Sequence, residues 1–476
     1  MPADSAGRGL SRRSYPTVAL HELATLDDAA RADLLERAED DLDHFLDGAA
    51  PIIAATRKEG DEALARFGRD FDAAAGLTAD AIAVTAADIE RAFDRLEPAL
   101  IDTLGYAADS IRRFHEAQKP PEMWMKEIRP GVLVGERVTP IDSVACYSPR
   151  GKGSFPSVTL MTTIPAVVAG VPRPIVLTPP GPDAEVDAAT LVAARLAGVE
   201  EIYKAGGAQA VAAVAYGTAT VPRCVKIVGP GSPWLVAAKR LLTGVIDPGL
   251  PAGPSETIVL ADSSANPLIA ALDMAIESEH GDDSSAFLVT WDRALAVAVR
   301  EAIPSYWDRM GDTLAGYSSS VLSGGRGGIV LAPDAEAAYA FVNDYAPEHL
   351  QVLSAAPFEH LAAIRNASEI LLGEHAAGSL ANYLMGPNCV LPTGGAARSH
   401  SPLGVHDFIK RASLGHVTAT GHADMAPHTY RFAHYEGFDG HANAVSEFRA
   451  AAHAGKGPET CTGANRFTPG AAPPDH

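Results

Sequence analysis

Residues 143–178 read SVACYSPRGKGSFPSVTLMTTIPAVVAGVPRPIVLT and predict a strand, a helix and a second strand. The apolar runs Ser143–Tyr147 and Pro174–Thr178 have the length of buried strands, and the helix is expected over Pro156–Ala169. A strand–helix–strand unit of this kind forms a right-handed crossover between parallel strands. The segment therefore predicts a parallel sheet with helices on both faces.

The same alternation continues downstream and predicts two α/β units. Further strands of the first unit are expected at 201–203, 225–228 and 257–261, the last of which closes the unit. The second unit is expected to have helices at 267–280, 292–303 and 334–345 and strands at 286–290, 328–331, 351–354 and 369–372. We therefore expect an α/β fold with two Rossmann-like, incomplete doubly wound domains at 132–265 and 266–400.

The two ends of the chain differ from this centre. Residues 1–131 are expected to form a helical N-terminal region, with one helix opening at Pro51 and another helical stretch over 86–118. Residues 401–476 are His-rich and less regular, and they include a predicted helix at 442–452 and a Gly/Pro/Thr-rich mobile tail.

Charge and composition exclude several classes of partner. The 38 Lys and Arg against 59 Asp and Glu give a net charge of −21, which argues against binding to nucleic acid or to an anionic membrane. No apolar run is long enough to predict a membrane span. The 4 Cys are scattered without a CxxC pair, which favours a reducing compartment and predicts a cytoplasmic protein.

Two glycine-rich turns each follow a predicted strand and open a predicted helix. They are Gly206-Gly207-Ala208-Gln209 and Gly229-Pro230-Gly231-Ser232. Glycine permits close approach of the backbone to a ligand, and a helix N-terminus attracts phosphate. The usual GxGxxG dinucleotide fingerprint is absent after the early strands, so ordinary turns explain the spacing as well as a nucleotide site does.

Two further segments combine Glu and His. Glu277 and His280 are three residues apart, so on a helix both would point to one face and could hold one metal ion. An acidic helix terminus followed by a His is the alternative. Glu348 and His349 pair a carboxylate with an imidazole just before a predicted strand, and α/β enzymes place chemistry at the carboxyl ends of strands. A solvated loop is the alternative for this pair.

The last segments carry weaker signals. Asn382 precedes a turn-rich loop at 386–393, in which Cys389 is expected to be a small buried residue rather than a nucleophile. The histidines around Glu436 and His441 lack zinc-finger spacing, and most are expected at the surface.

Together these segments resemble the histidinol dehydrogenase family from about Ala49 to about Arg449. The motifs that carry the resemblance are collinear and are Glu59-Gly60-Asp61, Tyr147-Ser148-Pro149-Arg150-Gly151, Gly206-Gly207-Ala208-Gln209-Ala210, Gly229-Pro230-Gly231, Ala252-Gly253-Pro254-Ser255-Glu256, Glu279-His280-Gly281-Asp282-Asp283-Ser284, Tyr345-Ala346-Pro347-Glu348-His349-Leu350, Gly386-Pro387-Asn388-Cys389-Val390-Leu391-Pro392-Thr393 and Glu436-Gly437-Phe438-Asp439-Gly440-His441.

The resemblance implies a zinc-dependent, NAD-linked dehydrogenase that oxidises a primary alcohol through an aldehyde to a carboxylate. It implies that Tyr147, Gln209 and Ser232 contact NAD. Glu348 would activate the water that adds to the aldehyde, and His349 would be the general base.

The resemblance also implies a metal site and a homodimer. Zinc would be held by Glu277, His280, Asn382 and His441, and the substrate would contact these residues together with Ser255, His349 and Glu436. His441 and Glu436 would come from the partner subunit of an intertwined homodimer.

Four positions depart from the family pattern. The family has Gln for Glu277, Asp for Asn382, His for Cys389 and Asn for Ser232. Because a carboxylate and an amide are exchanged between the first two positions, the resemblance still implies a metal site, whereas the Cys and Ser alter substrate and cofactor contacts.

The implied reaction is the oxidation of L-histidinol to L-histidine, in histidine biosynthesis. One alternative is a paralogue that acts on another small polar alcohol such as dihydroxypropanesulfonate, for which Arg150 and Lys152 are available as basic residues. A second is a non-catalytic family member with an altered zinc site, and a third is a zinc hydrolase.

Overall fold

The computed structural model describes residues 13–37, 42–150 and 153–461. Lys152 and the predicted tail from residue 462 lie outside the described residues. The chain divides into two compact units, one of residues 1–119 and 140–409 and the other of residues 120–139 and 410–476. None of the helices in the described ranges combines the length and the apolar character that crossing a membrane requires.

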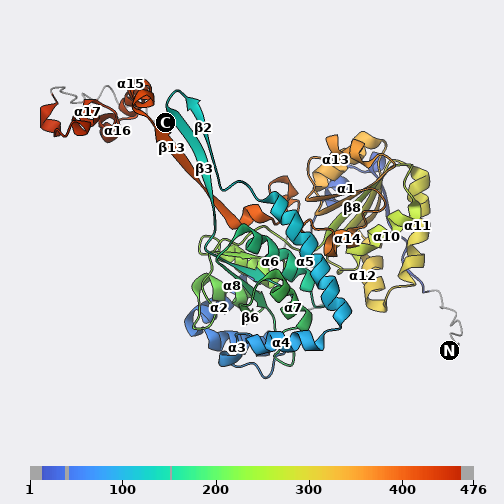
Figure 1. The fold of residues 1–476 in the computed structure, drawn as a ribbon. Helices are drawn as coiled ribbons and strands as arrows, with labels where there is room; N and C mark the ends of the chain where they lie inside the picture. Colours follow the sequence, from blue (N-terminus) through green and yellow to red (C-terminus); the bar gives the residue numbers. More distant parts are fainter. Residues whose placement is uncertain (1–12, 38–41, 151–152, 462–476) are drawn as a thin grey trace. The chain divides into compact units, whose positions relative to one another are not determined.

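Residues 143–178 form the predicted crossover in the first unit (Figure 1). Strand β4 (Ser143–Tyr147) is followed by helix α6 (Pro156–Ala169) and by strand β5 (Arg173–Thr178). β4 pairs in parallel with β5 and with β7 (Lys226–Val228), and β5 pairs with β6 (Ile202–Lys204). The result is a four-stranded parallel sheet of order β6-β5-β4-β7.

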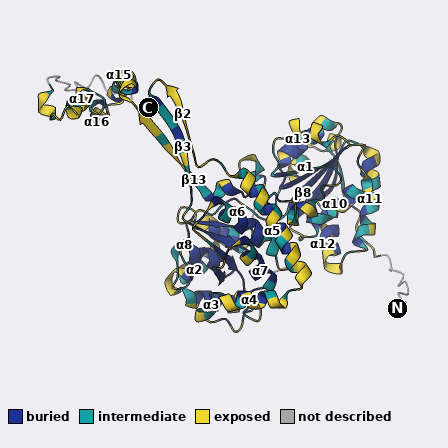
Figure 2. Ribbon diagram, in the orientation of Figure 1, coloured by how far each residue is buried: buried dark blue, intermediate teal, exposed yellow. Residues whose placement is uncertain are grey.

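Helices cover both faces of this sheet because alternate side chains of each strand point to opposite sides. In β4, Val144 and Cys146 pack into the core beneath α6 and α7, whereas Ala145 and Tyr147 pack into the core beneath α2 and α8. Figure 2 shows that the strands are mostly buried and that the helices have both buried and exposed residues. The helices around this sheet are α2 (Asp43–Glu59), α3 (Asp61–Phe71), α4 (Ala86–Arg95), α5 (Pro98–Gln118), α7 (Ala188–Ala197), α8 (Gly207–Tyr216) and α9 (Pro233–Leu241).

A six-stranded sheet of order β1-β10-β9-β8-β11-β12 forms the other half of the first unit. All of its strand pairs are parallel, which confirms the α/β class. Its strands are β1 (Leu20–Glu22), β8 (Glu256–Ala261), β9 (Ser285–Thr290), β10 (Gly327–Leu331), β11 (His349–Leu353) and β12 (Glu369–Leu372). Helices α10 (Pro267–Ser278), α11 (Arg293–Trp307) and α12 (Asp312–Ser323) pack on one face, and α13 (Ala335–Tyr345) packs on the other.

Two expectations about this sheet were wrong. The strand expected to close the first unit is β8, which pairs instead with β9 and β11 at the centre of the six-stranded sheet. The helical N-terminal region contributes strand β1, which pairs with β10. An apolar strand is equally suited to either sheet, so its partner depends on the path of the intervening chain.

The expected helix opening at Pro51 was also wrong, because α2 runs through this residue. Proline removes one backbone donor from the helix. Burial of Ala49 and Ile53 on either side of Pro51, against the core under α8 and α9, holds the helix together. The stretch 86–118 is two helices, since Leu96 and Glu97 are extended before Pro98 begins α5.

The second unit contains the hairpin β2 (Met123–Arg129) and β3 (Val132–Pro140), with β13 (Ile409–Val417) on the other side of β3. Residues 123–129 were expected in a helical region, so that expectation was wrong. Helices α15 (Ala419–Tyr435), α16 (Asp439–Asn443) and α17 (Glu447–His453) follow, and the predicted helix at 442–452 is split between α16 and α17.

Apolar side chains are unusually exposed in this second unit. Every residue of β2 is exposed, Phe432 is 70% exposed and Tyr435 is 91% exposed. Several large apolar side chains exposed on one unit are typical of an association site.

Candidate active site

The candidate catalytic residues lie at the amino edge of the six-stranded sheet. His349 is the first residue of β11, Glu369 is the first residue of β12, and the two are register partners. The expectation that Glu348 and His349 lie near the carboxyl ends of strands was wrong, because both lie at the amino end of β11. Helix α10 returns from the carboxyl end of β8 to the amino end of β9, so its last turn carries Glu277 to the amino edge.

His349 is surrounded by carboxylates. Its Nδ1 lies 2.8 Å from Glu369 Oε2, and its Nε2 lies 3.7 Å from Glu348 Oε1 and 4.0 Å from Glu277 Oε1. The backbone N–H of Glu256 donates to Glu348 Oε2 at 2.9 Å. Glu277 is only 4% exposed, and Glu348, His349 and Glu369 are each 7% exposed.

This arrangement shifts the pKa values of His349, Glu348 and Glu277. Burial alone lowers the pKa of His349, but Glu348, Glu277 and Glu369 together outweigh it and raise this pKa to about 10. Burial raises the pKa of Glu348 to about 8, and repulsion by Glu277 adds to the shift. Burial also acts to raise the pKa of Glu277, but His349 and His280 outweigh it and hold this pKa below its usual range.

Glu277 is the centre of a second set of polar contacts. Asn382, on the short helix α14 (Gly378–Tyr383), donates its Nδ2 to Glu277 Oε1 at 2.8 Å. His280 lies just beyond the end of α10, with its Nδ1 3.3 Å from Glu277 Oε2. The Ser255 side chain also hydrogen-bonds to Glu277. The structure therefore brings Glu277, His280, Asn382 and Ser255 together beside the catalytic pair.

These donors fit a divalent cation of the zinc type. Among the described residues, Glu277 forms ion pairs with the imidazoles of His280 and His349 and with no Lys or Arg side chain. Three buried carboxylates, those of Glu277, Glu348 and Glu369, therefore surround the ring of His349. A buried charge excess of this kind is costly without a cation. The amide of Asn382 presents its nitrogen here, and a half-turn would present its oxygen as a ligand.

The predicted metal ligands are divided between the two units. No group of three or more His, Cys, Asp or Glu side chains in the described ranges has metal-binding geometry. The fourth predicted ligand, His441, lies on α16 in the second unit, and Glu436 caps the end of α15 in the same unit.

The predicted cofactor residues share a different cavity. Tyr147, Gln209 and Ser232 line a space of about 470 Å³ at the carboxyl ends of the four-stranded sheet. The backbone N–H of Gly207 donates to the Tyr147 hydroxyl at 3.2 Å. Gly229 has a φ of +112°, and a Cβ there would meet the Tyr147 carbonyl oxygen at 2.2 Å, so this turn requires glycine.

We assigned no role from the sequence to three buried charged residues that lie at these two sites, namely Glu256, Glu369 and Lys239. Glu369 contacts the catalytic His349, and Glu256 forms an ion pair with Arg37, with 2.7 Å between the carboxylate and Nε. Buried Lys239 donates to the Gly229 carbonyl oxygen at 2.7 Å, and burial lowers its pKa to about 8. The sequence signal for Glu256 and Glu369 is an acidic residue at the first position of an apolar strand. The sequence does not show which side chain this acid contacts, because that depends on the order of the strands in the sheet.

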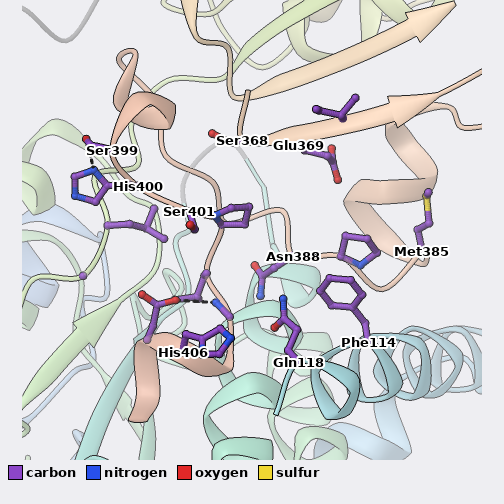
Figure 3. A pocket seen from close by; sticks show the side chains of 18 of the residues that line it. Phe114, Gln118, Ser368, Glu369, Met385, Asn388, Ser399, His400, Ser401 and His406 are labelled. Atoms are coloured by element: carbon purple, nitrogen blue, oxygen red, sulfur yellow. Dashed lines mark hydrogen bonds between the residues drawn. The ribbon is translucent and has the colours of Figure 1, made fainter. Parts of the chain in front are cut away.

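Cys389 lies beside this site, with its Sγ 4.0 Å from Glu369 Oε1. Burial and then the charge of Glu369 raise the pKa of the thiol well above its usual range, so the group stays a neutral thiol. Glu369 also forms part of the wall of a cavity of about 770 Å³, which Figure 3 shows with Phe114, Gln118 and Asn388 around it.

The profile of the histidinol dehydrogenase family matches residues 35–449. The chain belongs to the histidinol dehydrogenase family. It is 56% identical over 432 residues to a histidinol dehydrogenase homolog of Colwellia psychrerythraea, covering 91% of this chain and 97% of that protein. It is 58% identical over 429 residues to a histidinol dehydrogenase homolog of Cereibacter sphaeroides, covering 90% of this chain and 97% of that one.

A protein named histidinol dehydrogenase, from Synechocystis, is 45% identical over 414 residues, covering 87% of this chain and 95% of that protein. The crystal structure of histidinol dehydrogenase from Elizabethkingia anophelis superposes with a TM-score of 0.87 at 29% identity, covering 93% of this chain and 100% of that chain. The resemblance read from the motifs is thereby confirmed, and it spans nearly the whole chain.

Asp72, which lines the 470 Å³ cavity, is expected to make the free energy of unfolding depend on pH. Burial raises the pKa of Asp72 to about 6, although Arg150 partly opposes the shift, and its Oδ2 has no hydrogen-bond partner among the described residues. The pKa of Asp72 in the folded chain lies above its unfolded value of about 3.9. The protonated carboxyl therefore stabilises the fold fully only below about pH 3.9, and this contribution is lost as the pH rises through 6.

We therefore expect Asp72→Asn to raise the free energy of unfolding by up to about 2 kcal/mol at pH 8 and by about half as much at pH 5. Thermal and urea unfolding at both pH values measure the difference. Asp70→Asn changes an exposed neighbour and is the control. An equal effect of Asp72→Asn at both pH values would contradict the prediction.

Proposed function

We propose that this protein is a zinc-dependent, NAD-linked dehydrogenase that oxidises a primary alcohol through an aldehyde to a carboxylate. The observation that carries the proposal is the buried Glu348–His349 pair beside Glu277, His280 and Asn382. Membership of the histidinol dehydrogenase family supports an oxidoreductase. The non-catalytic alternative is disfavoured because the acid–base pair is retained and buried.

In the proposed reaction, His349 accepts the proton of the substrate hydroxyl at Nε2, the ring nitrogen that faces Glu348 and Glu277. The pKa of about 10 belongs to the metal-free chain, and a cation at Glu277 would lower it by offsetting the charge of the carboxylates. Tyr147, Gln209 and Ser232 would hold NAD, which would supply the hydride acceptor for the first oxidation. Glu348 accepts a proton from the water that adds to the aldehyde, and a second equivalent of NAD would supply the acceptor for the oxidation to the acid.

Zinc would be held by Glu277, His280 and Asn382 together with His441. When bound, it would polarise the substrate oxygen and lower the pKa of the hydroxyl. Ser255 and Glu436 would contact the substrate in the same pocket. Glu277, Glu348 and His349 are buried, which limits their contact with water and strengthens their electrostatic interactions.

L-histidinol is the first substrate to assay. A related small polar alcohol is the second candidate, because the relatives at 55–58% identity are named homologs, whereas those named histidinol dehydrogenase that we compared are 29–45% identical. Cys389 supports this alternative, since it contacts Glu369 beside His349 and replaces a family His. Steady-state NADH formation with L-histidinol, amino alcohols and dihydroxypropanesulfonate distinguishes them.

Substitutions of His349 and Glu348 are expected to impair different steps of the proposed reaction. His349→Ala should lower kcat by about 100-fold or more, because the general base is lost. Glu348→Gln should retain more of the first oxidation and accumulate aldehyde, so that NADH per alcohol falls from two towards one. Stopped assays with aldehyde trapping measure both. Unchanged NADH formation by His349→Ala would remove the assignment, and NAD affinity of each variant is the control for folding.

If Glu277 and Asn382 have exchanged a carboxylate and an amide relative to the family, a change at one position should be compensated by the reverse change at the other. Glu277→Gln should weaken zinc binding by about 10-fold or more, because the set loses its carboxylate. Adding Asn382→Asp should restore zinc binding. Metal analysis after dialysis measures the zinc content, and Glu279→Gln, at a position two residues further along the chain, is the control. Failure of the double variant to recover zinc would contradict the exchange.

The exposed apolar surface of the second unit supports a homodimer. Its β2 strand and the Phe432 and Tyr435 side chains are exposed in the single chain. We propose that a second copy covers them, and that His441 and Glu436 complete the partner's metal and substrate site.

Co-expression of two inactive variants tests this arrangement. In a heterodimer of His349→Ala and His441→Ala chains, one site would carry both changes and the other neither. Random pairing should therefore recover about a quarter of wild-type activity. Each variant alone, as a homodimer of measured mass, is the control. If the mixture stays inactive although heterodimers are isolated, each site is built from one chain.

A further inference from the structure

We propose that Glu369 is a positioning residue that fixes the ring orientation and the tautomer of His349. The inference rests on the proposed function, because it concerns the base of that reaction. It assigns a role to a carboxylate that does not belong to the acid–base pair or to the zinc set.

The backbone holds the two side chains next to each other. His349 and Glu369 begin adjacent parallel strands and are register partners, and the N–H of Glu369 donates to the Glu348 carbonyl oxygen at 3.0 Å. Side chains at paired positions of parallel strands point to the same face. The contact between Glu369 and His349 is therefore set by the sheet rather than by a mobile loop.

The contact selects one form of the imidazole. An ionised carboxylate can only accept hydrogen bonds, so Glu369 Oε2 at 2.8 Å requires the proton of the neutral ring to lie on Nδ1. Nε2 then carries the lone pair, and Nε2 is the nitrogen that faces Glu348 and Glu277. A general base needs this tautomer, because only an unprotonated Nε2 can take the hydroxyl proton.

The surroundings supply no equally fixed substitute among the described residues. The other oxygen of Glu369 has a weak contact with the Cys389 thiol at 4.0 Å. Glu369 also lies in the wall of the 770 Å³ cavity, so water would fill the space left by a shorter side chain (Figure 3). Water can either donate or accept, and it would therefore hold the ring without selecting the tautomer.

The test uses zinc-replete protein and the variants Glu369→Ala and Glu369→Gln. We expect Glu369→Ala to lower kcat by about 100-fold or more, whereas the alcohol KM and the affinity for NAD change by less than about three-fold. Glu369→Gln should be intermediate, because its amide oxygen can still accept from Nδ1. Glu359→Gln, at an exposed position of the same half of the unit, is the control.

A second readout does not depend on turnover. ¹⁵N spectra of histidine-labelled protein report which ring nitrogen carries the proton, and His349→Gln identifies the signal. Wild-type protein should show His349 protonated on Nδ1 in its neutral form, and Glu369→Ala should show a mixture of tautomers.

The outcomes separate the two proposals. If Glu369→Ala keeps both kcat and the Nδ1 tautomer, the positioning role is wrong. If kcat, KM, NAD affinity and unfolding temperature all change together while the tautomer is unchanged, Glu369 is structural and the role is again wrong. If wild-type protein oxidises no alcohol, the proposed function fails, whereas the tautomer of His349 and its dependence on Glu369 are still measured.

Discussion

The burial of one imidazole among three carboxylates constrains the whole catalytic half of this protein. Glu277, Glu348 and Glu369 come from a helix end and from two adjacent strands, and they meet only because these elements reach the same edge of the six-stranded sheet. Their mutual repulsion makes the cluster costly by itself. A cation at Glu277 would offset part of this cost, so the proposed metal binding and the proposed chemistry of His349 would depend on one another.

The two parallel sheets use opposite edges. The cavity that contains Tyr147, Gln209 and Ser232 lies at the carboxyl ends of the four-stranded sheet, where glycine turns open α8 and α9. The acid–base cluster lies at the amino edge of the six-stranded sheet. A nucleotide needs helix N-termini and close backbone approach. The acid–base cluster instead needs side chains from strand starts and a helix end, and the returning helix α10 supplies Glu277 there.

Departures from the family pattern are concentrated around Glu277 and Glu369. Asn382 contacts Glu277, and Cys389 contacts Glu369, so two replaced positions touch buried carboxylates. The exchange between Glu277 and Asn382 preserves one carboxylate at the proposed metal site. The thiol at Cys389 changes the polarity near His349 and thereby provides a physical route to a different substrate.

The sequence by itself determined the α/β class, the crossover at 143–178 and the glycine turns, and it indicated Glu348 and His349 as the candidate acid–base pair. These features are local, because hydrophobic periodicity and turn chemistry are set within short windows. Only the tertiary structure decided that β8 joins the second sheet, that β1 completes it and that the cluster lies at the amino edge. It also decided that Glu369 contacts His349. Those outcomes depend on which strands pair, and pairing is a contest between distant segments of similar apolar character that no local pattern resolves.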